Sequence, residues 1–136
     1  MPQHAGPVPL SLLACQVSIP STRSASERNA HVVALCAKIQ QVIDASGAVD
    51  LVVLPELCTI EYGTDAFAHL DVLAEPANGS SSQAFAQLAC NTAAMVVFGL
   101  AQFRRHPGDG KPSLPTEPEP GRGRLRWFGV LPAVAG

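Results

Sequence analysis

Residues 51–57 read Leu-Val-Val-Leu-Pro-Glu-Leu, and this stretch decides the fold. Four consecutive branched apolar residues are typical of a strand buried on both faces of a sheet, because such a strand has no solvent side on which polar residues could alternate. Pro55 has no N–H to give to a strand ladder, so it ends the strand. Glu56 then lies at the carboxyl end of a buried strand, where open α/β sheets hold their ligands. Taken alone, the heptapeptide fits a helix cap or a solvated loop acid equally well.

The segments on either side of this strand predict alternating strands and helices. The predicted elements are strands at 10–19, 51–54 and 95–101, a long helix that begins after Ser24 and ends at Gly47, and helices at 64–70 and 82–91. Helices that alternate with buried strands indicate an α/β sheet with right-handed crossovers. A dinucleotide-binding fold would share this order, but the turn after the first strand lacks the Gly-x-Gly-x-x-Gly pattern.

The long helix has the clearest local signals. Ser24-Ala-Ser-Glu27 is a capping box, and an apolar stripe of helical period follows it. The stripe consists of Val32, Leu35, Cys36, Ile39, Val42 and Ile43. We expect it to pack on the sheet, with Cys36 in the core rather than reactive, and we expect Arg28, Lys38, Gln40, Gln41 and Asp44 to stay in water. The serines near residue 80 are expected to cap the helix at 82–91.

Composition divides the chain into three parts. Residues 1–9 form a flexible amino terminus, residues 10–103 form the folded part, and residues 104–136 form a Pro/Gly-rich tail that we expect to be disordered. The net charge is −5 up to Phe103 and +3 from Arg104 onward. An acidic body and few scattered cations argue against nucleic-acid binding.

The spacing of the cysteines and histidines argues against a metal site. The four cysteines are widely spaced without a Cys-x-x-Cys pair, which favours reduced thiols in a cytoplasmic protein. The four histidines are equally dispersed, so we predict no metal and no cofactor. No apolar run reaches the length of a membrane span, and we expect no membrane association.

Several motifs together resemble the amino-terminal part of the nitrilase, or carbon–nitrogen hydrolase, superfamily. They are Ala14-Cys15-Gln16 in the first strand, the capped helix, the 51–57 stretch, Tyr62-Gly63, and Val-Val-Phe-Gly-Leu at 96–100. The resemblance covers about residues 10–103. It implies a partial α-β-β-α sandwich, limited to the first three strands and their helices.

The resemblance also implies an activity, the hydrolysis of non-peptide C–N bonds in small amides, nitriles or carbamoyl compounds. This chemistry needs a thiolate nucleophile, a base that generates it, and a donor or cation that stabilises the developing charge. In the family these roles belong to Cys, Glu and Lys, and Glu56 matches the catalytic glutamate. Tyr62 could line the substrate pocket, although a packed aromatic is an equally good interpretation.

The chain contains no match to the family's lysine and cysteine. Lys111 lies in a proline-interrupted segment unsuited to a buried strand. Cys58 lies two residues from Glu56, but no helix begins there to lower its pKa, so we do not expect it to be the nucleophile. We therefore expect a truncated hydrolase chain that is inactive alone.

Two alternatives stay open: a non-catalytic association or regulatory form, and an unrelated small α/β binding domain.

A sheet that ends after three strands leaves an apolar face and a free edge. We therefore expect the chain to self-associate.

Overall fold

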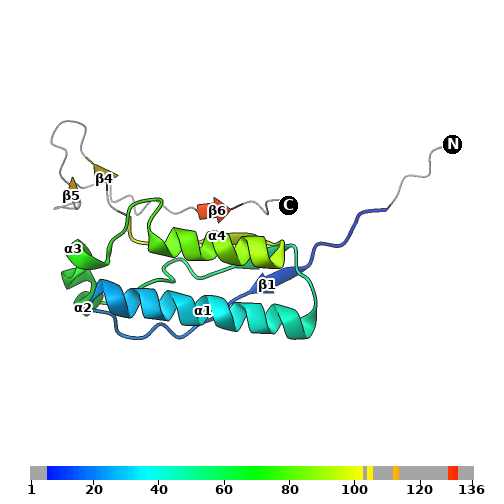
Figure 1. Cartoon of the computed structure of the whole chain (residues 1–136), viewed down its shortest axis with the longest axis horizontal. Coiled ribbons are helices and arrows are strands. Elements are labelled where there is room, and N and C mark those ends of the chain that lie inside the picture. The colour runs from blue at the N-terminus through cyan, green and yellow to red at the C-terminus, as the bar shows by residue number, and fades with distance from the viewer. Residues whose placement is uncertain (1–5, 103, 106–111, 114–128, 132–136) are drawn as a thin grey trace.

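The computed structural model describes residues 6–102, 104–105, 112–113 and 129–131 (Figure 1). The first part of the chain contains β1 (Leu12–Ala14), α1 (Ala25–Ser46), β2 (Leu51–Val53), α2 (Thr64–Ala68), α3 (Leu70–Leu73), α4 (Ser80–Thr92) and β3 (Met95–Phe98). Three short strands follow, β4 (Arg104–Arg105), β5 (Pro112–Ser113) and β6 (Gly129–Leu131). The element order is that of a mixed α/β fold, as the sequence predicts.

The main sheet has four strands in the order β1-β2-β3-β6. β1, β2 and β3 are parallel, with Leu51 opposite Leu12 on one side and opposite Met95 on the other. β6 pairs with the far edge of β3 in the antiparallel sense. The prediction that residues 51–54 lie centrally, between the strands near residues 10 and 95, is confirmed.

Helix α1 begins and ends as its sequence predicts. The backbone N–H of Glu27 donates to Oγ of Ser24 at 3.1 Å, and the Glu27 carboxylate accepts from the backbone N–H of Arg23 at 2.8 Å. At the other end, Gly47 adopts a φ of 101° and its N–H donates to the carbonyl of Ile43. A side chain at residue 47 would be strained there, which explains why a glycine ends the helix.

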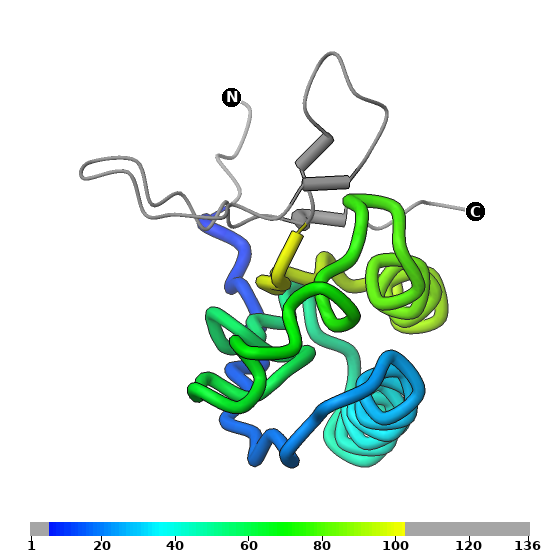
Figure 2. The backbone as a smooth tube through the Cα atoms, turned by 90° about the vertical axis from the view of Figure 1, so that its left-hand side faces the viewer, coloured from blue at the N-terminus to red at the C-terminus, as the bar shows by residue number. Residues whose placement is uncertain are grey.

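Helices α1 and α4 cover the same face of the sheet (Figure 2). The side chains between them come from alternate strand positions, because successive residues of a strand point to opposite faces. The core consists of Val32, Leu35, Ile39 and Ile43 from α1, Phe85, Leu88 and Ala89 from α4, and Val52, Leu54, Cys58, Ala94, Val96 and Phe98 from the strands and the segments beside them. Leu13 and Cys15 pack against this core from the β1 side. The rings of Phe85 and Phe98 lie 4.4 Å apart at its centre.

The opposite face of the sheet is also apolar, and the described helices do not pack on it. By the same alternation it is formed by Leu12, Ala14, Leu51, Val53, Met95 and Val97. Leu12 and Met95 are exposed on this face. We call these six residues the open face.

Two strands are shorter than the sequence predicts. β1 ends at Ala14 rather than at residue 19, because its partner β2 ends at Val53 just before Pro55 and offers no further ladder positions. β3 ends at Phe98 rather than at residue 101, because the Gly99 carbonyl turns to the loop after β2 and accepts from the N–H of Cys58.

The helices after β2 also differ from the predicted ranges. The helix predicted at 64–70 is split at His69 into α2 and α3, and a ring nitrogen of His69 contacts the carbonyl of Asp65 at 2.7 Å. Helix α4 begins at Ser80, two residues earlier than predicted, with Gly79 at the N-cap. The prediction that a serine caps it is wrong, since Gly79 provides no side-chain cap.

Two predictions about α1 fail for single residues. Val42 is partly exposed although it belongs to the apolar stripe, because the stripe is wider than the sheet surface below it. Arg28 is buried although we expected it to stay in water. Within the tail that we expected to be disordered, the structure describes the strands β4, β5 and β6, and its other residues, Lys111 among them, lie outside the described part of the chain.

Candidate functional site

Glu56 lies shortly after β2, the middle one of the three parallel strands. β2 ends at Val53, the N–H of Leu54 still donates to the carbonyl of Val97, and Pro55 then directs the chain out of the ladder. The Glu56 side chain is exposed at this carboxyl end of the strand. A ligand that approached this edge of the sheet would therefore meet the carboxylate without a rearrangement of the core.

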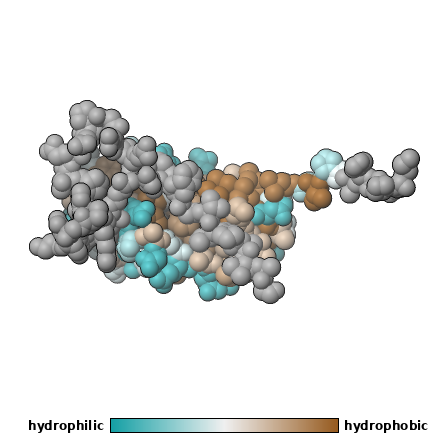
Figure 3. Space-filling model, turned by 90° about the horizontal axis from the view of Figure 1, so that it is seen from above, coloured by the Kyte–Doolittle hydropathy of each residue, from teal (hydrophilic) through white to brown (hydrophobic). Residues whose placement is uncertain are grey.

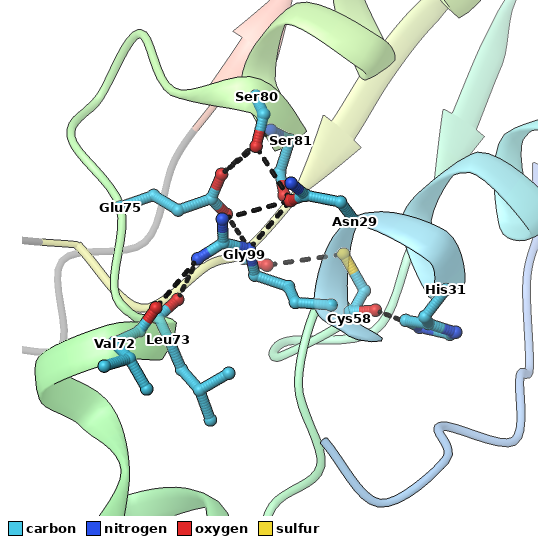
Figure 4. A network of polar contacts seen from close by, with 10 residues as sticks. Asn29, His31, Cys58, Val72, Leu73, Glu75, Ser80, Ser81 and Gly99 are labelled. Carbon is cyan, nitrogen blue, oxygen red and sulfur yellow. Dashed lines mark hydrogen bonds and ion pairs between the residues drawn. The ribbon is translucent and has the colours of Figure 1, made fainter. Parts of the chain in front are cut away.

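Cys58 anchors the loop that carries Glu56. Its backbone N–H and its thiol both donate to the carbonyl of Gly99, at 3.4 and 3.3 Å. Its own carbonyl lies 2.9 Å from Nε2 of His31, on helix α1 (Figure 4). The loop is thus attached to the residue after β3 and to α1 through Cys58, two positions after Glu56.

The Cys58 thiol is poorly suited to nucleophilic attack. Its side chain is completely buried, and desolvation raises its pKa to about 12, partly offset by the hydrogen bond to Gly99. The attacking species in thiol chemistry is the thiolate, so a thiol that keeps its proton at neutral pH is unreactive. The same cause raises the pKa of Cys36 to about 11. Among the described cysteines, only Cys90 is exposed.

Tyr62 is exposed on the same loop as Glu56. Its ring meets the ring of Phe67 edge to face, with the centroids 5.2 Å apart. Nearby, Oγ of Ser21 donates to the carboxylate of Glu61 at 3.1 Å and ties the loop to the segment before α1. Glu56 and Tyr62 are thus both exposed on the loop after β2, although residues 57–60 between them are buried.

A buried polar network lies behind this loop, and the sequence analysis missed it (Figure 4). Nε of Arg28 lies 3.5 Å from Oε2 of Glu75, and both side chains are almost fully buried. Nη1 of Arg28 also donates to the carbonyl of Leu73 at 2.7 Å, while Nε and Nη2 donate to Oδ1 of Asn29. Arg28 therefore connects the start of α1 to the end of α3.

Glu75 connects the same region to the start of α4. Its Oε1 accepts from the backbone N–H of Ser81 at 2.9 Å and from Oγ of Ser80 at 3.0 Å. A carboxylate that accepts from the first turn of a helix satisfies donors that have no partner within the helix. Glu75 thus takes the capping role that Gly79 has no side chain to fill. Its own N–H donates to the carbonyl of Ala101.

One signal in the sequence could have identified Arg28 as buried. It lies four residues before Val32, so it extends the apolar stripe by one helical turn. Its charge led us to place it in water. Glu75 had no such local signal, since its partner Arg28 is far away in the sequence.

The described residues form a groove at the other end of the sheet from Glu56. Its volume is about 230 Å³, and it lies between the start of β1 and the segment that joins α1 to β2. The described part of the chain contains no cluster of side chains suited to hold a metal ion. None of the described helices is both long and apolar enough to span a membrane.

These residues define a mixed α/β fold in which a loop acid follows the middle one of three parallel strands. No protein family model matches the chain, and no curated protein matches it. The solved structures similar to the chain include the crystal structure of Nit3 of Saccharomyces cerevisiae, a member of branch 10 of the nitrilase superfamily. The identity is 23% and the TM-score is 0.48, over 72% of this chain and 35% of Nit3. The chain thus spans about a third of the length of that protein.

Proposed function

We propose that the chain is an amino-terminal piece of a carbon–nitrogen hydrolase, of amidase or nitrilase type, in which Glu56 is the general base. The observation that carries the proposal is the position of Glu56, exposed directly after the central parallel strand on a loop that Cys58 holds in place. The motif at residues 51–57 supports the same assignment.

In this proposal the Glu56 carboxylate takes the proton of a cysteine thiol, and the thiolate adds to the carbonyl or nitrile carbon of a small substrate. With an amide, Glu56 returns the proton to the departing amine, which leaves an acyl group on the sulfur as a thioester. Glu56 then removes a proton from water, and the hydroxide that forms hydrolyses the thioester. Tyr62, exposed on the same loop, is proposed to line the substrate pocket.

We also propose that this chain has no turnover by itself. The Cys58 thiol is buried and protonated, and the family's cysteine and lysine have no counterpart in the sequence. A carboxylate alone supplies only general-base assistance, about 10²- to 10⁴-fold. The four free cysteines suit a reducing compartment, which supports a cytoplasmic location.

In this proposal the hydrolase-like sequence stops near Arg104, and the tail is a frameshifted or alternatively spliced terminus. The coding sequence beyond the codon for Arg104 provides the first test. We expect another reading frame there to encode a basic strand with a lysine and a glycine-rich turn with a cysteine. A chain rebuilt in that frame should hydrolyse amides or nitriles. Absence of these motifs from every frame would contradict the proposal.

The rebuilt chain also tests Glu56. The Glu56→Gln variant should lose about 10²-fold or more in kcat, because an amide cannot accept the thiol proton. The matched control is Glu61→Gln, which changes another acid of the same loop and should retain most of the activity. The unmodified 1–136 chain should show no more turnover than its Glu56→Gln variant. Activity that Cys58→Ser abolishes would identify Cys58 as the nucleophile and overturn the assignment.

A further inference from the structure

The outer edge of β1 is unpaired among the described residues. β1 is the terminal strand of the sheet, and no other described strand pairs with its outer side. The carbonyl of Ser11 and the N–H of Cys15 both bond to the β2 side. Because backbone groups of successive strand residues point to opposite sides, Leu12 and Ala14 direct their N–H and C=O groups outward.

The segment that precedes β1 is apolar and exposed. The side chains of Val8, Leu10 and Leu12 are 87%, 70% and 53% exposed. The neighbouring Leu13 instead packs against the core. Figure 3 shows apolar surface that runs out along this segment toward the amino terminus. In a strand extended back from β1, Pro7 and Pro9 would fall at positions that face β2, so they would remove no outward-pointing N–H group.

The edge lacks one of the usual protections against pairing. Many natural edge strands carry charged residues, which keep other strands away. Residues 6–20 contain no Asp, Glu, Lys, Arg or His. This segment offers no charge by which a charged partner could recognise it, and two copies of it can meet without like-charge repulsion.

The groove beside β1 provides space for an added strand. It is lined by Leu12 and Leu13 of β1, by Val42 and Ile43 of α1, and by Val49. α1 extends over the edge of the sheet here, which leaves Val42 partly exposed. A strand that pairs with β1 would place its alternate side chains under this overhang and cover Val42.

We propose that β1 pairs in the antiparallel sense with β1 of a second copy, about a twofold axis at Leu12. Outward-pointing residues must face each other in such a pair, which matches Leu12 with Leu12 and Leu10 with Ala14. Both open faces then lie on one side of a continuous sheet, and the Leu13 side chain of each copy enters the groove of the other. This proposal does not depend on the enzymatic assignment.

Sedimentation equilibrium of the full 1–136 chain tests the association, and we expect a dimer that dissociates on dilution. The Leu12→Lys variant should weaken it by about tenfold or more, because two like charges would lie directly opposite each other. The matched control is Val33→Lys, which adds the same charge at an exposed valine of α1 and should leave the dimer unchanged. Circular dichroism checks that both variants fold. A monomer at about 100 μM, larger polymers, or equal effects of the two variants would overturn the proposal.

Cross-linking tests the register in a Cys15→Ala, Cys90→Ser background. Opposed residues of a hydrogen-bonded antiparallel pair have Cα atoms about 5.5 Å apart, which a disulfide can span. Leu12→Cys should therefore form a covalent dimer on mild oxidation. Leu10→Cys is the control, because the two copies of residue 10 would lie about 13 Å apart and should not cross-link. Efficient cross-linking at residue 10 and not at residue 12 would overturn the proposed pairing.

Discussion

Nε of Arg28 lies 3.5 Å from Oε2 of Glu75, and the two side chains are only 7% and 3% exposed. Because neither charge reaches bulk water, each depends on the other and on its hydrogen bonds for the solvation that it loses on folding. The carbonyl of Leu73 and the N–H of Ser81 supply part of that compensation. The pair thus joins α1, α3 and α4 at one point.

We predict that Glu75→Ala lowers the free energy of unfolding by about 3–5 kcal/mol, because it leaves the Arg28 charge buried without a counterion. Arg28→Ala should have a similar effect, and the double variant should cost less than the sum of the two. Urea denaturation of all three variants measures the coupling.

The control for this pair is the exposed ion pair between Arg23 and Asp65. Its atoms lie closer, at 3.2 Å, but the side chains are 63% and 64% exposed. Solvent screening makes such a pair worth about 0–1 kcal/mol, so Asp65→Ala should change stability little. Equal losses for Glu75→Ala and Asp65→Ala would refute the role that we assign to burial.

Gly79→Ala should be destabilising by about 1–3 kcal/mol, because the added methyl group has no space. A Cβ at residue 79 would lie 3.0 Å from Cβ of Glu75 and 3.1 Å from both Oε1 of Glu75 and the carbonyl oxygen of Pro76. The thermal midpoint reports the loss. Gly6→Ala is the control, since no atom lies within 4 Å of its added Cβ. An unchanged midpoint for Gly79→Ala would show that the loop before α4 adjusts freely.

Ala93→Gly should stabilise the protein by about 0.5–1 kcal/mol. Ala93 ends α4 with a φ of 54°, a left-handed conformation that glycine adopts without steric cost. Its methyl group is exposed, so little packing is lost. Ala30→Gly, at an exposed position inside α1, should instead destabilise by about the same amount. If both changes lower the midpoint of urea unfolding, the strain at Ala93 is smaller than its φ implies.

The buried thiol of Cys58 should make stability fall at alkaline pH. Folding raises its pKa from 9.0 to about 12, so between these values the unfolded chain releases a proton that the folded chain keeps. The contribution of the protonated Cys58 thiol to the free energy of unfolding is complete below pH 9 and is lost as the pH rises toward 12. Between pH 8 and pH 10 the wild-type chain should lose roughly 1 kcal/mol more than Cys58→Ala. Parallel pH profiles for the two proteins would exclude this linkage.

The parts of the fold that the sequence predicts well depend on neighbours in the chain. The capping box at Ser24 and Glu27 and the end of α1 at Gly47 lie where expected, because every group involved is within one helical turn. The central position of β2 follows from its unbroken apolar run.

The features that the sequence did not predict depend on distant partners. The length of β1 is set by Pro55, which ends the neighbouring strand, and the burial of Glu75 is set by Arg28 on another helix. The exposure of Glu56 agrees with its motif, whereas the anchoring of its loop by His31 and Gly99 requires the packed structure. The local sequence pattern therefore located Glu56 but not the residues that hold its loop in place.

The parallel arrangement of β1, β2 and β3 also constrains how the chain reaches its native state. Leu12 pairs with Leu51 and Leu51 pairs with Met95, so each strand pairs with a strand roughly forty residues further along the chain. Contacts between such distant residues slow folding, because the intervening chain must be ordered before they form. During synthesis, helix α1 and both of its ends leave the ribosome long before β3 does. The apolar stripe of α1 therefore lacks the β3 part of its core until Met95–Phe98 emerges, and we expect apolar surface to stay exposed on the nascent chain during this interval.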